Sequence, residues 1–159
     1  MRIVGIDLAG KPNNPTGFCL LVDSKSEVKL LHTNEEILCE IERANPELIA
    51  IDAPFGFPEK GWFREADKLL KEKGFKPLPP VWPGMRPLVE RAISLVKFLR
   101  HKGYRVIEVF PRASEKILGL QKAGRVNSDR YDALLCALTG KAYLEGNFEN
   151  ISEIIIPRV

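Results

Sequence analysis

Two aspartates stand three positions apart at the start of an apolar segment, "SDRYDALLCALTG", over residues 128–140. Asp129 and Asp132 would lie on neighbouring positions of one helical face. Carboxylates at such a place have two uses. Asp129 can cap the helix while Asp132 stabilises the helix dipole, or the pair can hold a metal ion through oxygen ligands. Taken by itself, this segment favours the capping role.

Two further aspartates interrupt apolar runs: Asp7 in "VGIDLAG" and Asp52 in "IAIDAPFG". An ionised carboxylate in a buried strand is costly unless it is paired, hydrogen-bonded or bound to a metal. Taken singly, Asp7 can form a turn at a strand end, and Asp52 can accept hydrogen bonds from loop amides before Pro54. If the two strands are neighbours, Asp7 and Asp52 converge and Asp132 can join them. Such a group of carboxylates cannot all ionise without a cation, and oxygen ligands suit Mg²⁺ or Mn²⁺.

A third acid within a strand pattern is Glu108, in "VIEVFPR". By the two-residue period of a strand it shares a face with Val106 and Phe110. Two interpretations remain open. Glu108 is a further metal ligand, or it forms an ion pair with Arg112 or Arg130.

The elements that would position these acids follow from hydrophobic periodicity and from Gly and Pro positions. We expect five strands, over residues 2–10, within a hairpin spanning 16–33 that turns at Asp23–Ser26, over 47–58 and over 104–111. We expect helices over residues 35–45 with Asn34 as N-cap, over 62–74, 85–103 and 114–120, and from 128 to near Gly146. Residues 151–157 fit either a strand or a tail. This order predicts an α/β fold with a five-stranded mixed sheet flanked by helices, whose ligand site lies at the carboxyl ends of strands.

An irregular insert rich in Pro and aromatic residues occupies about residues 55–84. Six aromatic side chains lie in it: Phe55, Phe57, Trp62, Phe63, Phe75 and Trp82. Trp62, Phe63 and Trp82 can stack on the bases of a frayed or single strand. The alternative, which we favour, is a local core made by all six.

The composition is that of one soluble globular domain over residues 1–159, with 45% hydrophobic and 28% charged residues. Apolar runs fall short of the roughly 20 residues of a membrane helix, and the first ten residues are typical of a strand rather than of a signal peptide. We therefore expect a cytoplasmic protein that does not enter membranes. Cys19, Cys39 and Cys136 are odd in number and far apart. We expect buried free thiols rather than disulfides or a zinc site.

The net charge of +3 is unevenly distributed. Residues 84–130 contain eleven Lys or Arg and four acidic residues, so this segment carries +7 and the rest of the chain −4. A basic segment fits a surface that binds a polyanion such as nucleic acid, and it fits a solvated helix face equally well.

Four motifs in order resemble one family: "GIDLAG" with the following "TGF", "IDAPFGFP", "VIEVFPRAS" and "DRYDALLCALTG". Together they are similar to the family known as domain of unknown function 429, described as predicted nucleases of the ribonuclease H-like superfamily. The resemblance runs from residue 3 to about residue 146. It implies a ribonuclease H-like fold and metal-dependent hydrolysis of phosphodiester bonds.

The chain is similar, more distantly, to the Holliday-junction resolvase of that superfamily. This similarity implies that Asp7 is the first-strand metal ligand, Asp52 the fourth-strand ligand, and Asp129 and Asp132 the helix pair. Glu108 matches an acid on the fifth strand whose role the similarity does not fix. Two departures stand out. Asp52 replaces a Glu of the resolvase, and the insert occupies the region where a resolvase builds its junction-binding and dimer surfaces. We therefore do not expect this chain to be specific for Holliday junctions.

The function predicted from these observations is a nuclease that hydrolyses DNA or RNA by a two-metal-ion mechanism. Asp7 would bridge two Mg²⁺ or Mn²⁺ ions about 3.5–4 Å apart, Asp52 would hold one ion and Asp132 the other, and Asp129 would assist. Five basic residues would bind phosphates: Arg112, Lys116, Lys122, Arg125 and Arg130. A homodimer is compatible with the sequence.

Two other functions remain open at this stage. The first is a nucleic-acid or protein-binding module that keeps the fold without turnover. The second is nucleotide phosphotransfer, because sugar kinases and actin-like ATPases share this sheet topology. Those proteins clasp the nucleotide between two such domains, and 159 residues supply one.

Overall fold

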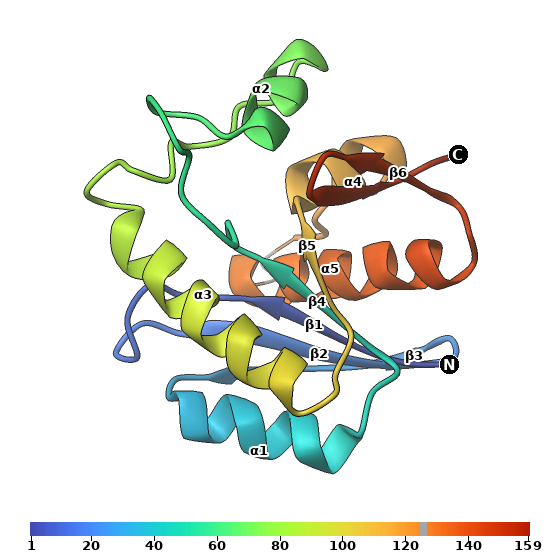
Figure 1. The fold of residues 1–159 in the computed structure, drawn as a ribbon. Coiled ribbons are helices and arrows are strands. Elements are labelled where there is room, and N and C mark those ends of the chain that lie inside the picture. Colours follow the sequence, from blue (N-terminus) through green and yellow to red (C-terminus); the bar gives the residue numbers. More distant parts are fainter. Residues whose placement is uncertain (125–126) are drawn as a thin grey trace.

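The computed structural model describes residues 1–124 and 127–159. Within that part of the chain, seven strands form one mixed sheet in the order β3-β2-β1-β4-β5-β7-β6 (Figure 1). The strands are β1 (Arg2–Asp7), β2 (Thr16–Val22), β3 (Lys25–Leu31), β4 (Leu48–Asp52), β5 (Val106–Val109), β6 (Phe148–Ile151) and β7 (Ile154–Pro157). The helices are α1 (Asn34–Ala44), α2 (Glu65–Glu72), α3 (Arg86–His101), α4 (Pro111–Ile117) and α5 (Ser128–Leu144).

The predicted α/β class and mixed sheet are confirmed, but the predicted number of five strands is wrong. The two additional strands, β6 and β7, form an antiparallel hairpin, and β7 also pairs in parallel with β5. All four residues of β7 are buried. The turn uses Ser152 in a left-handed conformation, with φ of 59°. Four-residue strands show too little periodicity for the sequence to separate a strand from a tail.

The sheet topology brings the ends of three strands to one edge. β1 is antiparallel to β2 and parallel to β4, and β4 is parallel to β5. The carboxyl ends of β1, β4 and β5 therefore point the same way. The register places Asp7 directly opposite Asp52. This is the adjacency on which the convergence of the two aspartates depends.

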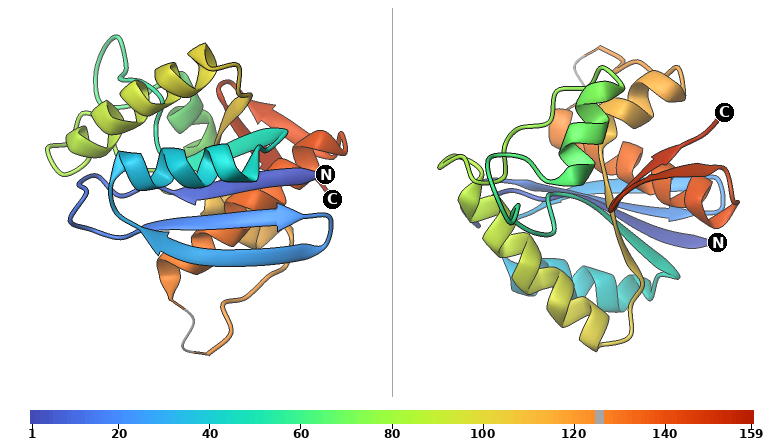
Figure 2. Two further views of the ribbon diagram at one scale, coloured as in Figure 1. Left: turned by 90° about the horizontal axis from the view of Figure 1, so that it is seen from below. Right: turned by 45° about the horizontal axis from the view of Figure 1, so that its top comes forward.

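Helices cover both faces of the sheet (Figures 1 and 2). On one face, α1 and α3 pack against the strands through a core that includes Ile37, Leu95 and Ile51. On the other face, α5 packs through Ala133 and Ala137 onto β1 and β2. Side chains of β1 and β4 thus alternate between the two layers, as the two-residue period of a strand requires.

Helix α5 lies unusually close to the backbone of the sheet, because glycines face it. A Cβ added to Gly5 would clash with the carbonyl oxygen of Ala133, and one added to Gly17 would clash with the carbonyl oxygen of Asp129. Only Gly leaves room for this approach. The close packing places the first turn of α5 beside the carboxyl end of β1, which is where Asp129 and Asp132 are needed.

Several local expectations are corrected. Thr33, rather than Asn34, caps α1, since its hydroxyl accepts a hydrogen bond from the amide of Glu36 at 3.1 Å. Helix α4 begins at Pro111, three residues earlier than expected, because Pro suits the first helical turn. Cys39 is exposed, although Cys19 and Cys136 are buried as predicted; it lies on α1 away from the face that Ile37 buries. No helix among the described residues is long and apolar enough to cross a membrane.

Candidate active site

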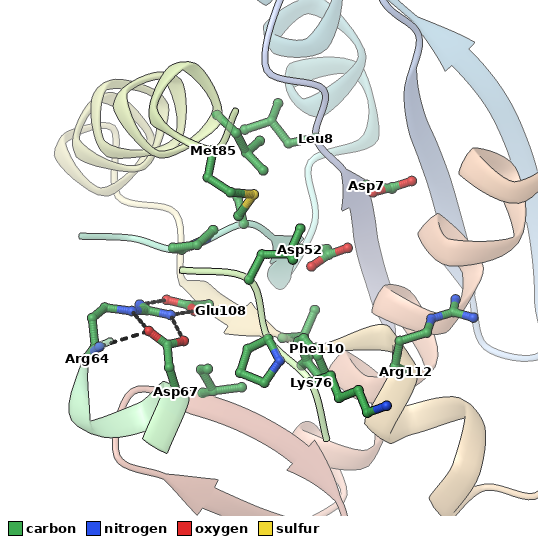
Figure 3. Close-up of a pocket in the computed structure, with 17 residues that line it drawn as sticks. Asp7, Leu8, Asp52, Arg64, Asp67, Lys76, Met85, Glu108, Phe110 and Arg112 are labelled. Atoms are coloured by element: carbon green, nitrogen blue, oxygen red, sulfur yellow. Dashed lines mark hydrogen bonds and ion pairs between the residues drawn. The ribbon is translucent and has the colours of Figure 1, made fainter. Parts of the chain in front are cut away.

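A pocket of about 270 Å³ opens at the carboxyl ends of β1, β4 and β5 (Figure 3). Asp7 and Asp52 line it from the sheet, and Met85 and Leu88 line it from the start of α3. Residues 76–78 of the insert complete its wall. The pocket therefore lies at the place where open α/β sheets bind their ligands.

Asp7 and Asp52 lie on the sheet face that α5 covers. Asp7 lies two residues after Gly5 and therefore shares its face of β1, and this face meets the α5 backbone. Asp52 likewise shares its face of β4 with Ala50, whose Cβ lies on the same side as Gly140 of α5. Figure 3 shows both carboxylates directed to that side. The sequence-based prediction that Asp7 and Asp52 converge is borne out by this register and orientation.

The electrostatics of this pair are those of like charges held together. Burial, followed by the nearby Asp52 and Asp132 carboxylates and a hydrogen bond with Asp129, raises the pKa of Asp7. Burial and the charge of Asp132 likewise raise the pKa of Asp52. Arg112, whose charge acts in the opposite direction on Asp52, is itself ion-paired with Asp132 and Glu115. Two carboxylates this close do not both ionise unless a cation binds, so without one the pair holds a proton.

The first turn of α5 brings the other two aspartates to this edge. Asn127 caps the helix, because its side chain accepts a hydrogen bond from the amide of Arg130 at 3.1 Å. The expectation that Asp129 is the N-cap is therefore wrong, and neither aspartate is needed for capping. Both Asp132 and Asp129 raise the pKa of Asp7, and the charge of Asp132 also raises the pKa of Asp52.

Asp132 carries a protein cation of its own. The Arg112 guanidinium donates a hydrogen bond to its carboxylate, and the Arg112 and Asp132 side chains are 50% and 22% exposed. Arg112 also pairs with Glu115 at 3.1 Å. Among the described residues, no group of three or more His, Cys, Asp or Glu side chains is arranged so that it holds a metal. Two oxygen donors are in place, and the third candidate, Asp132, is held by an arginine.

Glu108 lies on the opposite face of β5 and forms part of a buried network. It shares this face with Val106, which packs in the core under α1 and α3. Its carboxylate accepts hydrogen bonds from both terminal nitrogens of Arg64, at 2.8 and 2.7 Å, and from the amide of Phe55 at 3.0 Å. Arg64 also binds Asp67 at 2.9 Å.

The expectation that Glu108 pairs with Arg112 or Arg130 is therefore wrong. Arg64 lies 44 residues away in sequence, inside the insert. Burial raises the pKa of Glu108, and Arg64 acts against that shift. Through this network, which itself lines the pocket, Glu108 joins the insert to β5 (Figure 3).

The predicted basic residues are spread over a wider area. Arg112 lines the pocket. Lys116 lies over the ring of Phe75 at 5.6 Å, Lys122 donates to the hydroxyl of Ser128, and Arg130 is exposed on α5. The remaining predicted residue, Arg125, lies outside the described residues. Sequence reasoning missed a further basic group: Lys76 of the insert lines the pocket, and the four prolines around it hid its position.

The favoured prediction of a local aromatic core in the insert is wrong. Trp62 and Trp82 are 58% and 46% exposed. Phe75 packs edge-on against Phe110, whereas Phe55 packs against the core under α1 and α3. The insert is held by the buried Arg64 network and by Ala66 and Leu70 of α2, which pack with the β6–β7 hairpin, and the tryptophans take no part in that core.

The family comparison matches residues 5–130 to the family described as "Protein of unknown function (DUF429)". The chain belongs to the DUF429 family. The matched region of this DUF429 protein contains Asp7, Asp52, Glu108 and Asp129, and it ends two residues before Asp132. Comparison with curated proteins finds no match.

Solved structures with a similar fold include T. thermophilus RuvC in complex with a Holliday junction substrate. It aligns with a TM-score of 0.58 and 19% sequence identity, over 92% of this chain and 96% of that chain. Another Thermus thermophilus RuvC structure aligns with a TM-score of 0.49 and 18% identity, over 92% and 97% of the two chains. The first of these alignments shows that the DUF429 protein has a fold similar to that of RuvC.

Proposed function

We propose that this DUF429 protein is a metal-dependent nuclease that hydrolyses phosphodiester bonds of DNA or RNA at the Asp7–Asp52 edge. One observation carries the proposal. Two aspartates stand in register at the ends of neighbouring parallel strands, inside a pocket, and the Arg112 of that pocket is ion-paired with Asp132. Acids that served only the fold would be spread over turns and caps. The RuvC complex, whose fold this chain shares, supports a nucleic acid as substrate.

The donor set suits Mg²⁺ or Mn²⁺. The candidate ligands are all carboxylate oxygens, which these hard cations prefer. Asp7 would contact both ions, Asp52 would hold one and Asp132 the other, and Asp129, whose carboxylate acts on Asp7, would assist. When bound, the ions would supply an activated water and stabilise the leaving oxygen.

The chain's own residues then have distinct tasks. Asp7 and Asp52 fix the position of the reaction at the strand ends. Asp132 completes the set once Arg112 releases it, and Arg112 becomes available to a phosphate oxygen. Glu108 is a positioning residue, because its contacts go to Arg64 and the Phe55 amide rather than to the pocket's other acids.

The basic residues of this account bind the nucleic-acid backbone. Arg112 and Lys76 do so inside the pocket, and Lys116, Lys122, Arg125 and Arg130 extend the contact along the strand. Each neutralised phosphate releases counterions, so the affinity falls as salt rises. A homodimer stays a prediction.

The test is a substrate panel of labelled single strands, duplexes, RNA–DNA hybrids and four-way junctions. Each is incubated with Mg²⁺, Mn²⁺ or EDTA, with wild type, Asp7→Asn, and Asp23→Asn as the matched control. Asp23 is an exposed turn residue with φ of 56°, a conformation that Asn accepts. Cutting that needs the metal and is lost only in Asp7→Asn supports the nuclease. Nucleic-acid binding without cutting in every condition would favour the binding module instead.

A further inference from the structure

The pocket at the strand ends has two chemically different sides. Figure 3 shows Met85 and Leu8 on one side of Asp52, and Lys76 and Arg112 on the other. One side is apolar and the other carries two cationic side chains, of which Arg112 is ion-paired with Asp132. The buried Arg64–Asp67–Glu108 network completes the lining. A ligand that combines an apolar part with an anionic part fits the first two sides.

The apolar side is built by side chains that the fold leaves accessible. Leu78 of the insert is 53% exposed and lines the pocket. Met85 lies opposite the sheet, with its sulfur directed into the pocket (Figure 3). A thioether makes favourable contacts with aromatic rings, and the methyl groups of a leucine side chain offer apolar surface to the face of a ring. Together they suit a planar, aromatic group such as a nucleobase.

The charged side matches a phosphate group. Lys76 is exposed, and the Arg112 side chain is half-exposed. Hydrogen bonds between such cations and phosphate oxygens are charge-assisted and stronger than neutral ones. Both cations lie at the pocket that Asp7 and Asp52 line. The phosphate would thus lie at the acidic edge, with the base directed toward Met85.

The size of the pocket favours one nucleotide over a stacked base pair. Its volume of about 270 Å³ is near the lower limit of small-molecule sites. A base in a duplex is held in the stack, and it reaches a recessed wall only after leaving that stack. The pocket therefore has room for a single nucleotide.

We propose that this pocket takes one unpaired nucleotide, with its phosphate beside Lys76 and Arg112 and its base against Leu78 and Met85. The substrate class is then single-stranded or locally unpaired nucleic acid. This inference rests on the proposed nuclease function, and it adds to that function the choice of substrate.

Binding is measured by fluorescence anisotropy with Ca²⁺ as the cation. The three labelled probes are a short thymidine strand, an abasic strand of the same length, and the thymidine strand in a duplex. Wild type is expected to bind the thymidine strand at least about fivefold more tightly than the abasic strand, because stacking on one base contributes about 1–3 kcal/mol. The duplex should also bind more weakly than the thymidine strand.

Substitutions in the pocket test which side chains produce the preference for the thymidine strand over the abasic strand. Leu78→Ala and Met85→Ala should each reduce the ratio between thymidine and abasic strands. Ile93→Ala, a change at an exposed position on α3 outside the pocket, should leave it unchanged. Lys76→Ala should weaken the binding of both strands by the same factor. It should also lower the salt dependence of the affinity, as the loss of a phosphate contact does. Because Leu78 is exposed, Leu78→Ala should fold normally. The test therefore remains decisive even if Met85→Ala does not fold.

Two results would overturn the inference: equal affinity for thymidine and abasic strands, or a duplex bound as tightly as the single strand. Cleavage of the same unlabelled sequences with Mn²⁺ separates this inference from the nuclease proposal. A duplex cut as fast as the single strand contradicts the unpaired-nucleotide pocket and leaves the nuclease standing. A retained base preference with no cutting contradicts the nuclease and supports the pocket.

Discussion

Removing one of the paired carboxylates should make the metal-free protein more stable. Asp7 and Asp52 face each other in register, and the pKa of each is raised, first by burial and then by neighbouring carboxylates. A carboxyl group whose pKa is raised in the folded state stabilises the fold fully when the pH is below its ordinary pKa, near 4. That contribution is lost as the pH rises through the folded-state pKa. The neutral amide of Asp7→Asn has no such loss.

The size of the effect follows from the same argument. One unit of pKa shift corresponds to about 1.4 kcal/mol. Asp7 shares the cost with Asp52, so we expect Asp7→Asn to raise the free energy of unfolding by about 1–3 kcal/mol at pH 8. For a domain of this length, 1 kcal/mol shifts Tm by about 2–4 °C. The variant should therefore melt about 3–10 °C above wild type in EDTA at pH 8, and the difference should shrink at pH 5.

Thermal unfolding with and without Mn²⁺ completes the assay. Bound cation stabilises the folded state by mass action, by about 2.7 kcal/mol at a hundredfold excess over Kd. Wild type should gain this stability at pH 8, whereas Asp7→Asn should gain none. The reasoning is refuted if Asp7→Asn melts below wild type in EDTA at both pH values. That result would mean that the Asp7 carboxylate serves the fold, as a strand-end turn former does.

Three further outcomes follow from the packing and the ion pairs. Arg64→Ala should lower the free energy of unfolding in urea by about 3–5 kcal/mol, because it leaves two carboxylates buried without their cation; a loss below about 1 kcal/mol would show that the network contributes little. Gly17→Ala should cost about 1–3 kcal/mol and weaken Mn²⁺ binding measured by calorimetry, since the added methyl pushes α5 away from β2. Gly56→Ala, where a methyl meets open space, is its control and should change neither quantity. Arg112→Ala should tighten Mn²⁺ binding by freeing Asp132 and weaken nucleic-acid binding, and the opposite pair of changes would contradict its assigned role.

The parts of this site that the sequence predicts are those encoded by local patterns. Asp7 and Asp52 each interrupt an apolar strand, and the two-residue period puts each on a definite face. The adjacency of their strands follows from the family resemblance rather than from either motif alone. Asp129 and Asp132 fall at a helix start, and their spacing places them together.

The parts that escape the sequence depend on distant residues. Glu108 and Arg64 meet across 44 positions, and no local pattern favours that pair over the nearer Arg112. The cap at Asn127 was hidden by the aspartate two positions later, which suits a cap equally well. Lys76 reaches the pocket through a segment whose prolines remove every periodicity. Tertiary contacts decide all three, and a single sequence records them only weakly.

The most direct test of the central claim is to measure Mn²⁺ binding and single-turnover cleavage on the same samples of wild type, Asp7→Asn and Asp23→Asn. We expect cleavage and Mn²⁺ binding by wild type to saturate at the same Mn²⁺ concentration. Asp23→Asn should keep both properties, and Asp7→Asn should lose both. Cleavage that persists in Asp7→Asn or in EDTA, or tight Mn²⁺ binding by Asp7→Asn, would contradict a catalytic metal site at the Asp7–Asp52 edge.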